Sequence, residues 1–291
     1  MRYRFLRFPG GKAKAVTLSY DDGILEDIHM SNIISKYGIK CTFNINAESL
    51  RENHLSEQQM KEYILDRGHE VAVHGAQHLA PGSVRSSEAI KDVLECRLEL
   101  EKKLGIIIRG MAYPDSGITY FENGASYENI KGYLKDLDIA YARSLGGDNT
   151  DFLLPRDWYN WIPSAHHANP SVMEIIDEFI ALDMSIEACR KRKINVSKRG
   201  PRLFYMWGHS YEYERIHGWQ LLEDICVKIS GKEDIWYATN MEIYEYVNAY
   251  NSLVFSADSS IVHNPTNNEI WFDEGGVLYK ISSGETITVK S

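Results

Sequence analysis

The stretch from Ala15 to Gly23 (AVTLSYDDG) most strongly constrains how this chain folds. Its apolar run ends in Asp21, Asp22 and Gly23, which is typical of a buried strand that delivers charge to a loop. Adjacent carboxylates repel each other, so at the edge of a core they favour a nearby positive charge such as a metal ion. Because Asp-Gly is also a common turn dipeptide, the stretch predicts a strand end that is either a turn or a metal site.

Strand and helix patterns alternate along most of the chain. Helical periodicity is found in residues 24–37, 57–65, 87–104, 127–137, 171–182, 219–229 and 241–249. Short β-rich runs lie between these segments, at 39–46, 69–73, 106–111, 139–142, 202–207 and 234–238. This alternation implies parallel βαβ units, and about seven of them predict an α/β protein with a distorted barrel of parallel strands.

The texture changes near the end of the chain. From Leu253 onward short strands are separated by Asn, Gly and Ser turns, without a helical stretch. We therefore predict a barrel over residues 1–250 and a small β-rich segment over residues 251–291, which either forms an appendage or completes the edge of the main fold.

The overall composition excludes several classes of protein. The 291 residues are 44% hydrophobic and 25% charged, which is typical of a soluble globular protein. A net charge of -9 argues against binding to nucleic acid or to an anionic membrane. The sequence shows neither a signal peptide nor a run long enough to span a membrane, so we expect a cytoplasmic location. The oligomeric state is left open.

A second polar cluster follows the β-rich run at 69–73. His74 and His78 are spaced i and i+4, which on a helical turn would place both imidazoles on one face and let them converge on one cation. In a parallel barrel this cluster and the aspartate pair would both lie at the carboxyl ends of neighbouring strands, where the catalytic residues of such barrels gather. The two clusters together favour a metal site over capping or surface histidines.

At these residues the chain resembles a known family. Ser19 to Gly23 is similar to the T-F-D-D-G motif of the polysaccharide deacetylases of carbohydrate esterase family four. His74 to His78 is similar to their H-[ST]-x-x-H motif, with Gly75 in the Ser/Thr place. The resemblance covers roughly residues 10 to 250 and implies a distorted barrel of parallel strands.

The resemblance also implies roles for the matching residues. Asp21 would be the general base, and Asp22, His74 and His78 would hold a divalent ion, with zinc as the first expectation and cobalt, nickel or manganese as alternatives. The chemistry agrees with this division, because a cation held by three protein ligands keeps positions open for water and substrate. A carboxylate just outside those ligands can take the proton of the water.

The remaining catalytic groups match the family less well. His209 follows the β-rich run at 202–207, resembles the late Leu-His motif, and is the candidate general acid. Ala112 stands where the family has an arginine that orients the catalytic aspartate. We expect Arg143 rather than Arg109 to supply that guanidinium, because Arg143 lies at a strand end. Asp157 is a weak candidate for the carboxylate that pairs with His209.

Aromatic and polar side chains in the same regions predict a substrate surface. The predicted substrate contacts are Tyr113, Pro114, Trp158, His167 and Trp207. Around Trp158 and His167, flat rings with polar donors are typical of sugar-binding surfaces, but a buried aromatic patch under a long loop is an equal alternative.

These features predict a metal-dependent carbohydrate deacetylase. It would hydrolyse an amide other than a peptide bond, most simply the N-acetyl group of an amino sugar, in an acetylated sugar or oligosaccharide substrate. One alternative keeps the metal site but hydrolyses a small cyclic ureide or imide. Another is a non-catalytic carbohydrate-binding protein, suggested by Ala112 and by residues 251–291, although retention of the Asp and His residues argues against it.

Overall fold

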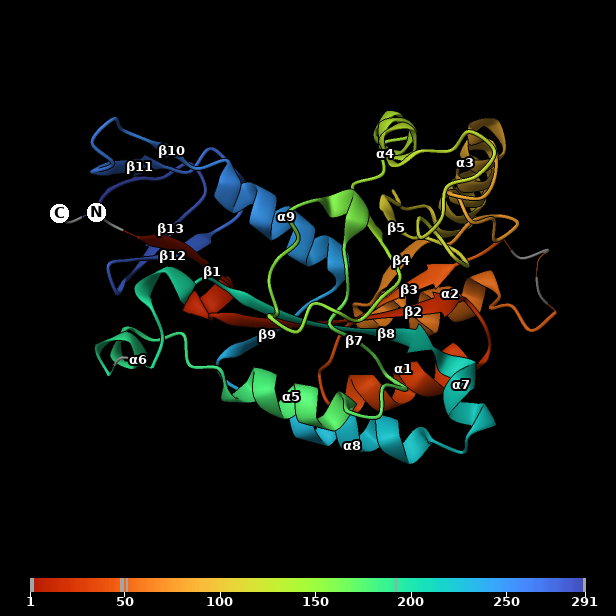
Figure 1. Cartoon of the computed structure of the whole chain (residues 1–291), viewed down its shortest axis with the longest axis horizontal. Coiled ribbons are helices and arrows are strands. Elements are labelled where there is room, and N and C mark those ends of the chain that lie inside the picture. The colour runs from red at the N-terminus through yellow and green to blue at the C-terminus, as the bar shows by residue number, and fades with distance from the viewer. Residues whose placement is uncertain (1–2, 48–49, 51, 192, 290–291) are drawn as a thin grey trace.

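Parallel strands form the central sheet of the computed structural model, which describes residues 3–47, 50, 52–191 and 193–289 (Figure 1). Over these residues the sheet has eight strands, in the order β6-β5-β4-β3-β2-β8-β7, with β9 pairing to β2. Their bounds are β2 (Lys14–Asp22), β3 (Cys41–Ile45), β4 (Glu70–Val73), β5 (Gly110–Ala112), β6 (Tyr141–Arg143), β7 (Ala165–His166), β8 (Arg202–His209) and β9 (Ile235–Tyr237). Each pairing is parallel, so the predicted barrel is confirmed.

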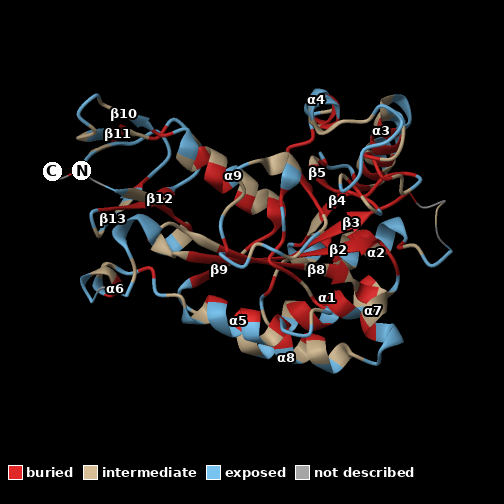
Figure 2. Ribbon diagram, viewed as in Figure 1, coloured by how far each residue is buried: buried red, intermediate tan, exposed pale blue. Residues whose placement is uncertain are grey.

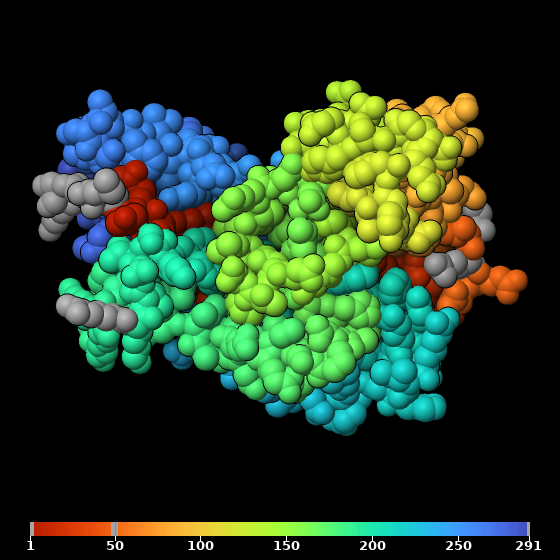
Figure 3. Space-filling model, in the orientation of Figure 1, coloured from red at the N-terminus to blue at the C-terminus, as the bar shows by residue number. Residues whose placement is uncertain are grey.

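The sheet curls because one segment joins its two edges. Trp161 forms a parallel bridge with Arg143 at the end of β6, and four residues later β7 pairs with β8. The chain after β6 therefore connects the first and last strands of the sheet. In the space-filling view this stretch (light green) lies on the surface between α9 (Asn240–Asn251) and α5 (Val172–Ala181) (Figure 3).

Helices cover both faces of the sheet. Besides α5 and α9 they are α1 (Glu26–Lys36), α2 (Glu57–Tyr63), α3 (Ser86–Leu104), α4 (Tyr127–Asp136), α6 (Ile186–Arg190), α7 (Ser210–Arg215) and α8 (Trp219–Ile229). In Figure 1, α1, α5, α7 and α8 lie below the sheet, and α3, α4 and α9 lie above it. Figure 2 shows the strands buried and the outer helix faces exposed. None of these described helices is both long and apolar enough to cross a membrane.

Apolar periodicity explains where the helices pack. In α3, Val93, Cys96 and Leu100 recur at helical spacing and are fully buried against the sheet. The helix ends at Gly105, whose φ of 69° is the left-handed conformation that glycine adopts at low cost. The predicted helices are found within a few residues of their expected bounds, whereas the short α6 and α7 were not predicted.

The two chain ends meet in small antiparallel sheets. β1 (Arg4–Arg7) pairs with β12 (Ile270–Glu274), which also pairs with β13 (Val277–Ile281). A second sheet contains β10 (Val254–Phe255), β11 (Ile261–His263) and β14 (Thr286–Thr288). β1 was not predicted, and the division into 1–250 and 251–291 stays a prediction.

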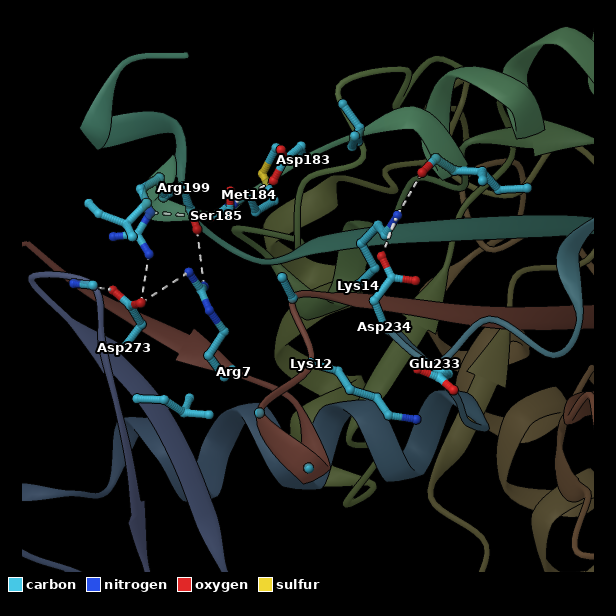
Figure 4. A pocket seen from close by; sticks show the side chains of 18 of the residues that line it. Arg7, Lys12, Lys14, Asp183, Met184, Ser185, Arg199, Glu233, Asp234 and Asp273 are labelled. Atoms are coloured by element: carbon cyan, nitrogen blue, oxygen red, sulfur yellow. Dashed lines mark hydrogen bonds and ion pairs between the residues drawn. The ribbon is translucent and has the colours of Figure 1, made fainter. Parts of the chain in front are cut away.

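A buried ion pair fastens β12 to the amino end of the barrel. Arg199 precedes β8 and places Nη2 2.6 Å from the Oδ2 atom of Asp273, while Arg7 Nη2 lies 3.9 Å from the same oxygen. Figure 4 shows both arginines turned toward Asp273, beside a cavity of about 730 Å³. Lys14, at the start of β2, lines the same cavity. This end of the barrel therefore holds structural ion pairs.

Glu70 links several elements at the same end of the barrel. Its carboxylate accepts hydrogen bonds from the Tyr141 hydroxyl (2.6 Å), the Thr42 hydroxyl (2.8 Å) and the Met241 backbone N–H (2.9 Å). Burial raises the pKa of Glu70 to about 7, because desolvation of the carboxylate outweighs these three donors.

Glu70 should therefore make folding less favourable as the pH rises. The pKa in the folded state lies above the ordinary value, so stability that is present below pH ~4 is lost as the pH rises to about 7, at most ~3 kcal/mol. We expect the Glu70→Gln variant to lose less unfolding free energy than the wild type between pH 5 and pH 8, measured by urea unfolding with a chelator present. Glu245→Gln, an exposed glutamate in α9, is the control. Parallel pH dependences in wild type and Glu70→Gln would contradict the prediction.

Candidate active site

Both carboxylates at the end of β2 reach the same point. Neighbouring strand residues normally point to opposite faces of a sheet. Here Asp22 has a φ of 94°, a strained value for a residue with a side chain, and Gly23 follows with a φ of 69°. His74 Nε2 lies 3.8 Å from Asp21 Oδ2 and 3.9 Å from Asp22 Oδ1. We attribute the convergence of the two aspartates to this turn of the backbone.

His74 has one ring nitrogen engaged and the other directed at the carboxylates. Nδ1 lies 3.0 Å from the backbone oxygen of Ala112, and because a carbonyl can only accept, Nδ1 carries the proton. Nε2 is buried and has no hydrogen-bond partner among the residues that the structure describes. Metal-binding histidines usually donate the N–H that does not face the metal to a carbonyl or carboxylate, and the Nδ1 contact of His74 orients its ring in the same way.

The segment that carries the two histidines is a loop, so the predicted helical turn is wrong. Gly75 and His78 have φ values of 77° and 56°, which break any helix. Asp92 in α3 accepts a hydrogen bond from the backbone N–H of Gln77 at 2.5 Å and so holds the loop. A Cβ atom on Gly75 would lie only 2.2 Å from Asp92 Oδ2, so this close approach requires glycine. The sequence spacing alone contained no sign of Asp92.

The residues predicted as metal ligands fit a divalent ion. The Asp22, His74 and His78 donor atoms all lie within 4.8 Å of one another. His78 Nε2 is 3.8 Å from Asp22 Oδ1, and the His78 side chain is 27% exposed whereas the other two are buried. Two imidazoles and one carboxylate form a donor set that catalytic zinc uses with a position left open. The His74 Nε2 atom makes no hydrogen bond to the residues that the structure describes.

Asp21 is held by two donors in a buried setting. Arg143 Nη2 donates to Asp21 Oδ2 at 2.5 Å, and Asn44 Nδ2 donates to Oδ1 at 2.8 Å. Burial by itself would raise the pKa of Asp21, but Arg143 together with His74, His209 and the hydrogen bond from Asn44 outweighs it, and the net pKa is lowered. Asp21 is therefore ionised at neutral pH, as a proton acceptor must be.

The two candidate arginines lie in different places. Arg143 ends β6, is fully buried, and stacks its guanidinium 4.4 Å from the ring centre of Trp207. Arg109 precedes β5 and pairs with Asp138 at 2.8 Å near the surface. The structure thus brings Arg143 to Asp21, because the end of β6 faces the end of β2 across the curled sheet.

His209 lies between two carboxylates. Its Nε2 is 4.0 Å from Asp21 Oδ2, and its Nδ1 is 3.4 Å from Glu212 Oε2. Burial would lower the pKa of His209, but Glu212 together with Asp21 raises it overall, which favours the protonated imidazole.

The partner of His209 is a correction to the sequence analysis. Asp157 pairs instead with Lys131 and caps the short helix at 158–160, so it is not available to His209. The sequence analysis missed Glu212 as a partner. His209 is the N-cap residue of α7 and Glu212 follows three residues later, the capping-box spacing that directs the Glu212 carboxylate back to His209.

Most of the predicted substrate side chains do not face the catalytic groups at the carboxyl end of the barrel. Tyr113 is buried and its hydroxyl donates to the backbone oxygen of Tyr159, and Pro114 is buried beside Gly75. Trp158 packs edge-on against Trp161 in the aromatic cluster under α9, so the buried-patch alternative describes it.

Trp207 and His167 remain close to the catalytic groups. Trp207 is partly exposed, its indole N–H donates to the backbone oxygen of Gly146 at 2.7 Å, and its ring centre is 6.1 Å from that of His209. His167 is fully buried, which lowers its pKa to about 3, and so it cannot contact a substrate at the surface. Of the five predicted substrate residues, only Trp207 combines exposure with proximity to the catalytic groups.

Removing the loop support should weaken metal binding. Without the Asp92 carboxylate, the backbone N–H of Gln77 loses its partner and the turn that aims His78 is no longer held. We expect Asp92→Ala to bind zinc about 10- to 100-fold more weakly, as changes behind metal ligands usually do, measured by calorimetric titration of the metal-free protein. Glu95→Ala, an exposed carboxylate one turn further along α3, should bind as the wild type does. Equal affinity in both variants would contradict the role of Asp92.

Comparisons with known proteins concern the family and the fold of the chain. Residues 8–133 match the family described as polysaccharide deacetylase. A candidate polysaccharide deacetylase from Mycobacterium smegmatis is 16% identical, with a TM-score of 0.56 and coverage of 84% of this chain and 94% of that one, which supports the fold. No curated protein shows detectable sequence similarity to the chain.

Two more distant structures complete the comparison. The chitin deacetylase of the fungus Colletotrichum lindemuthianum is 15% identical, with a TM-score of 0.46 and coverage of 78% of this chain and 84% of that one. A CE4 family pseudoenzyme from Bacillus anthracis is 15% identical, with a TM-score of 0.47 and coverage of 82% and 68%.

Proposed function

Because residues 8–133 belong to the polysaccharide deacetylase family, we propose that the chain is a metal-dependent hydrolase that removes an acyl group, in the first place N-acetyl, from a carbohydrate. The single observation that carries the proposal is the convergence of Asp21, Asp22 and His74, with His209 4.0 Å from Asp21, at one end of the barrel. An acetylated sugar or oligosaccharide is the proposed substrate, and zinc the proposed metal.

Asp22, His74 and His78 would hold the metal ion. When bound, a divalent ion supplies Lewis-acid polarisation of an acyl oxygen and lowers the pKa of a water molecule. His74 is suited to bind a metal ion because burial lowers its pKa to about 4, so its imidazole is neutral at neutral pH.

Proton transfer would be divided between Asp21 and His209. Hydrolysis adds water across the carbon–nitrogen bond, so one group must accept a proton from water and another must give a proton to the leaving amine. Asp21 is ionised and can accept at its carboxylate oxygens, with Arg143 as the positioning residue that fixes it. His209 can donate from Nε2, which faces Asp21, while Glu212 stabilises the imidazolium from the Nδ1 side.

Acetate release from N-acetylglucosamine oligomers tests the proposal. We expect Asp22→Ala to lose bound metal and activity, and Asp21→Asn to keep the metal while its rate falls by roughly 10²–10⁴, the range typical of general-base loss. Metal content is measured by mass spectrometry and acetate by an enzymatic assay.

Parallel assays with acetyl esters of sugars and with cyclic imides separate the substrate classes. Turnover of cyclic imides alone would replace the carbohydrate proposal with the alternative amide hydrolase. Sugar binding without turnover of any of these substrates would indicate a non-catalytic protein, and full activity in Asp22→Ala would rule out the proposed metal site.

The two arginines form a matched pair for testing how Asp21 is positioned. Removing Arg143 takes away the charge that lowers the pKa of Asp21, so the acid limb of the pH–rate profile should move to higher pH and kcat should fall. We expect this for Arg143→Gln, with roughly 10- to 100-fold lower kcat if the lost interaction is worth about 1.4–2.7 kcal/mol. Arg109→Gln should leave both unchanged. Because loss of a buried charge partner also costs stability, circular dichroism and the milder Arg143→Lys variant accompany the assay. An unshifted pH profile in a folded Arg143→Gln variant would exclude the role.

A further inference from the structure

A second group of imidazoles and a carboxylate lies beside the first. His166 ends β7, His167 follows it, and Glu212 comes from α7. The Nε2 atoms of His166 and His167 are each 3.3 Å from Glu212 Oε2, and one donor atom from each of the three residues lies within 4.8 Å of the others. The group thus repeats the composition of the first cluster, with two histidines and one carboxylate.

The contacts of His167 do not compensate for the free energy needed to bury its imidazole. The side chain is fully buried, and neither ring nitrogen has a hydrogen-bond partner among the described residues. A buried polar group without a hydrogen bond destabilises the folded state, because its desolvation is not compensated. The lack of hydrogen bonds therefore suggests that a further ligand binds this buried imidazole.

The surroundings hold this imidazole in one orientation. Its ring packs beside two tyrosine rings, with ring centres 4.1 Å from Tyr213 and 5.6 Å from Tyr20, and these two tyrosine rings are 6.1 Å apart. The two tyrosine hydroxyls hydrogen-bond to each other at 2.7 Å. A Cβ atom on Gly208 would lie 2.0 Å from His167 Nδ1, so the position of the ring depends on glycine there. The ring is packed into place with Nε2 facing Glu212.

The spacing of the donors matches that of ligands around one ion. Two ligands about 2.1 Å from a tetrahedral zinc ion lie about 3.4 Å apart, close to the 3.3 Å that separates each imidazole nitrogen from the carboxylate oxygen. The His166 and Glu212 side chains are 25% and 28% exposed, so the group is open to solvent on one side. We propose that His166, His167 and Glu212 form a second divalent-metal site.

The competing interpretation is a hydrogen-bonded network without metal. The backbone N–H of Ala168 donates to His166 Nδ1 at 3.1 Å, which favours a proton on Nε2 that could be donated to Glu212. That network would satisfy His166 and Glu212 but leaves both nitrogens of His167 without a hydrogen bond to any described residue, whereas a metal ion would engage His167 Nε2. Metal binding would require the His166 ring to release the Ala168 contact.

The second site borders the proposed catalytic acid. Glu212 Oε2 is 3.4 Å from His209 Nδ1, and the other nitrogen of His209 faces Asp21. His209 therefore lies between the two metal groups. The second site shares no ligand with the Asp22, His74 and His78 group, so metal binding at one does not require metal at the other, although Glu212 also contacts His209.

Metal stoichiometry tests the second site. Tag-free protein is stripped with a chelator and titrated with Zn²⁺ alone, by calorimetry and by mass spectrometry of the metal retained after dialysis. We expect two zinc ions per chain in the wild type, one in Asp22→Asn, one in Glu212→Gln, and none in Asp22→Asn combined with Glu212→Gln. Glu214→Gln, in the same helix but bonded to Trp219, should retain two.

A second variant keeps the test independent of folding at one position. His166→Ala removes a partly exposed ligand and should also reduce the stoichiometry from two to one, with the fold checked by circular dichroism. One zinc ion in the wild type that is lost in Asp22→Asn would overturn the second site and leave the proposed function intact. One zinc ion that is lost only in Glu212→Gln would support the second site and overturn the metal site of the proposed function. Two zinc ions retained in both Glu212→Gln and His166→Ala would also overturn the second site.

Discussion

Burial of the Asp21 carboxylate against the Arg143 guanidinium is the interaction on which the site depends. Both groups are almost wholly buried, and a carboxylate in such a place is ionised only when a charge partner and hydrogen bonds compensate its desolvation. The partner comes from β6, which is four places from β2 in the sheet order. The pair can form only across the interior of a curled sheet, so the curvature of the barrel and the ionisation of Asp21 are linked.

The two ends of the barrel have different electrostatic roles. At the carboxyl end, residues from β2, β8 and the loop after β4 bring acidic and imidazole groups close together, and His74 Nε2 has no hydrogen-bond partner in the part of the chain that the structure describes. At the amino end, Arg199 pairs with Asp273, and the Glu70 carboxylate accepts three hydrogen bonds that do not fully offset its desolvation. The amino end therefore joins elements of the scaffold, whereas the carboxyl end is where the catalytic residues of parallel barrels gather.

Backbone strain and close packing shape the carboxyl end of the barrel. Asp22 and His78 have positive φ values although neither is glycine, and Gly75 and Gly208 lie where a Cβ atom would overlap a neighbouring side chain. Each of these features directs an acidic or imidazole group into the site. The surrounding barrel, whose strands are buried on both faces, compensates for the free-energy cost of these strained positions.

Alternating apolar runs and helical periodicity were enough to predict the parallel barrel, because strand and helix patterns depend on local spacing that is visible in the chain. The aspartate pair, His74, His78 and His209 could also be picked out, since each follows a buried strand and strand ends meet at one edge. Contacts between distant segments could not be read in this way. Arg143 could be preferred to Arg109 for the same reason, because it lies at a strand end. The support of His78 by Asp92, the pairing of His209 with Glu212 and the joining of β1 to β12 each depend on which surfaces pack together in three dimensions, and a residue pattern along the chain carries no measure of that packing.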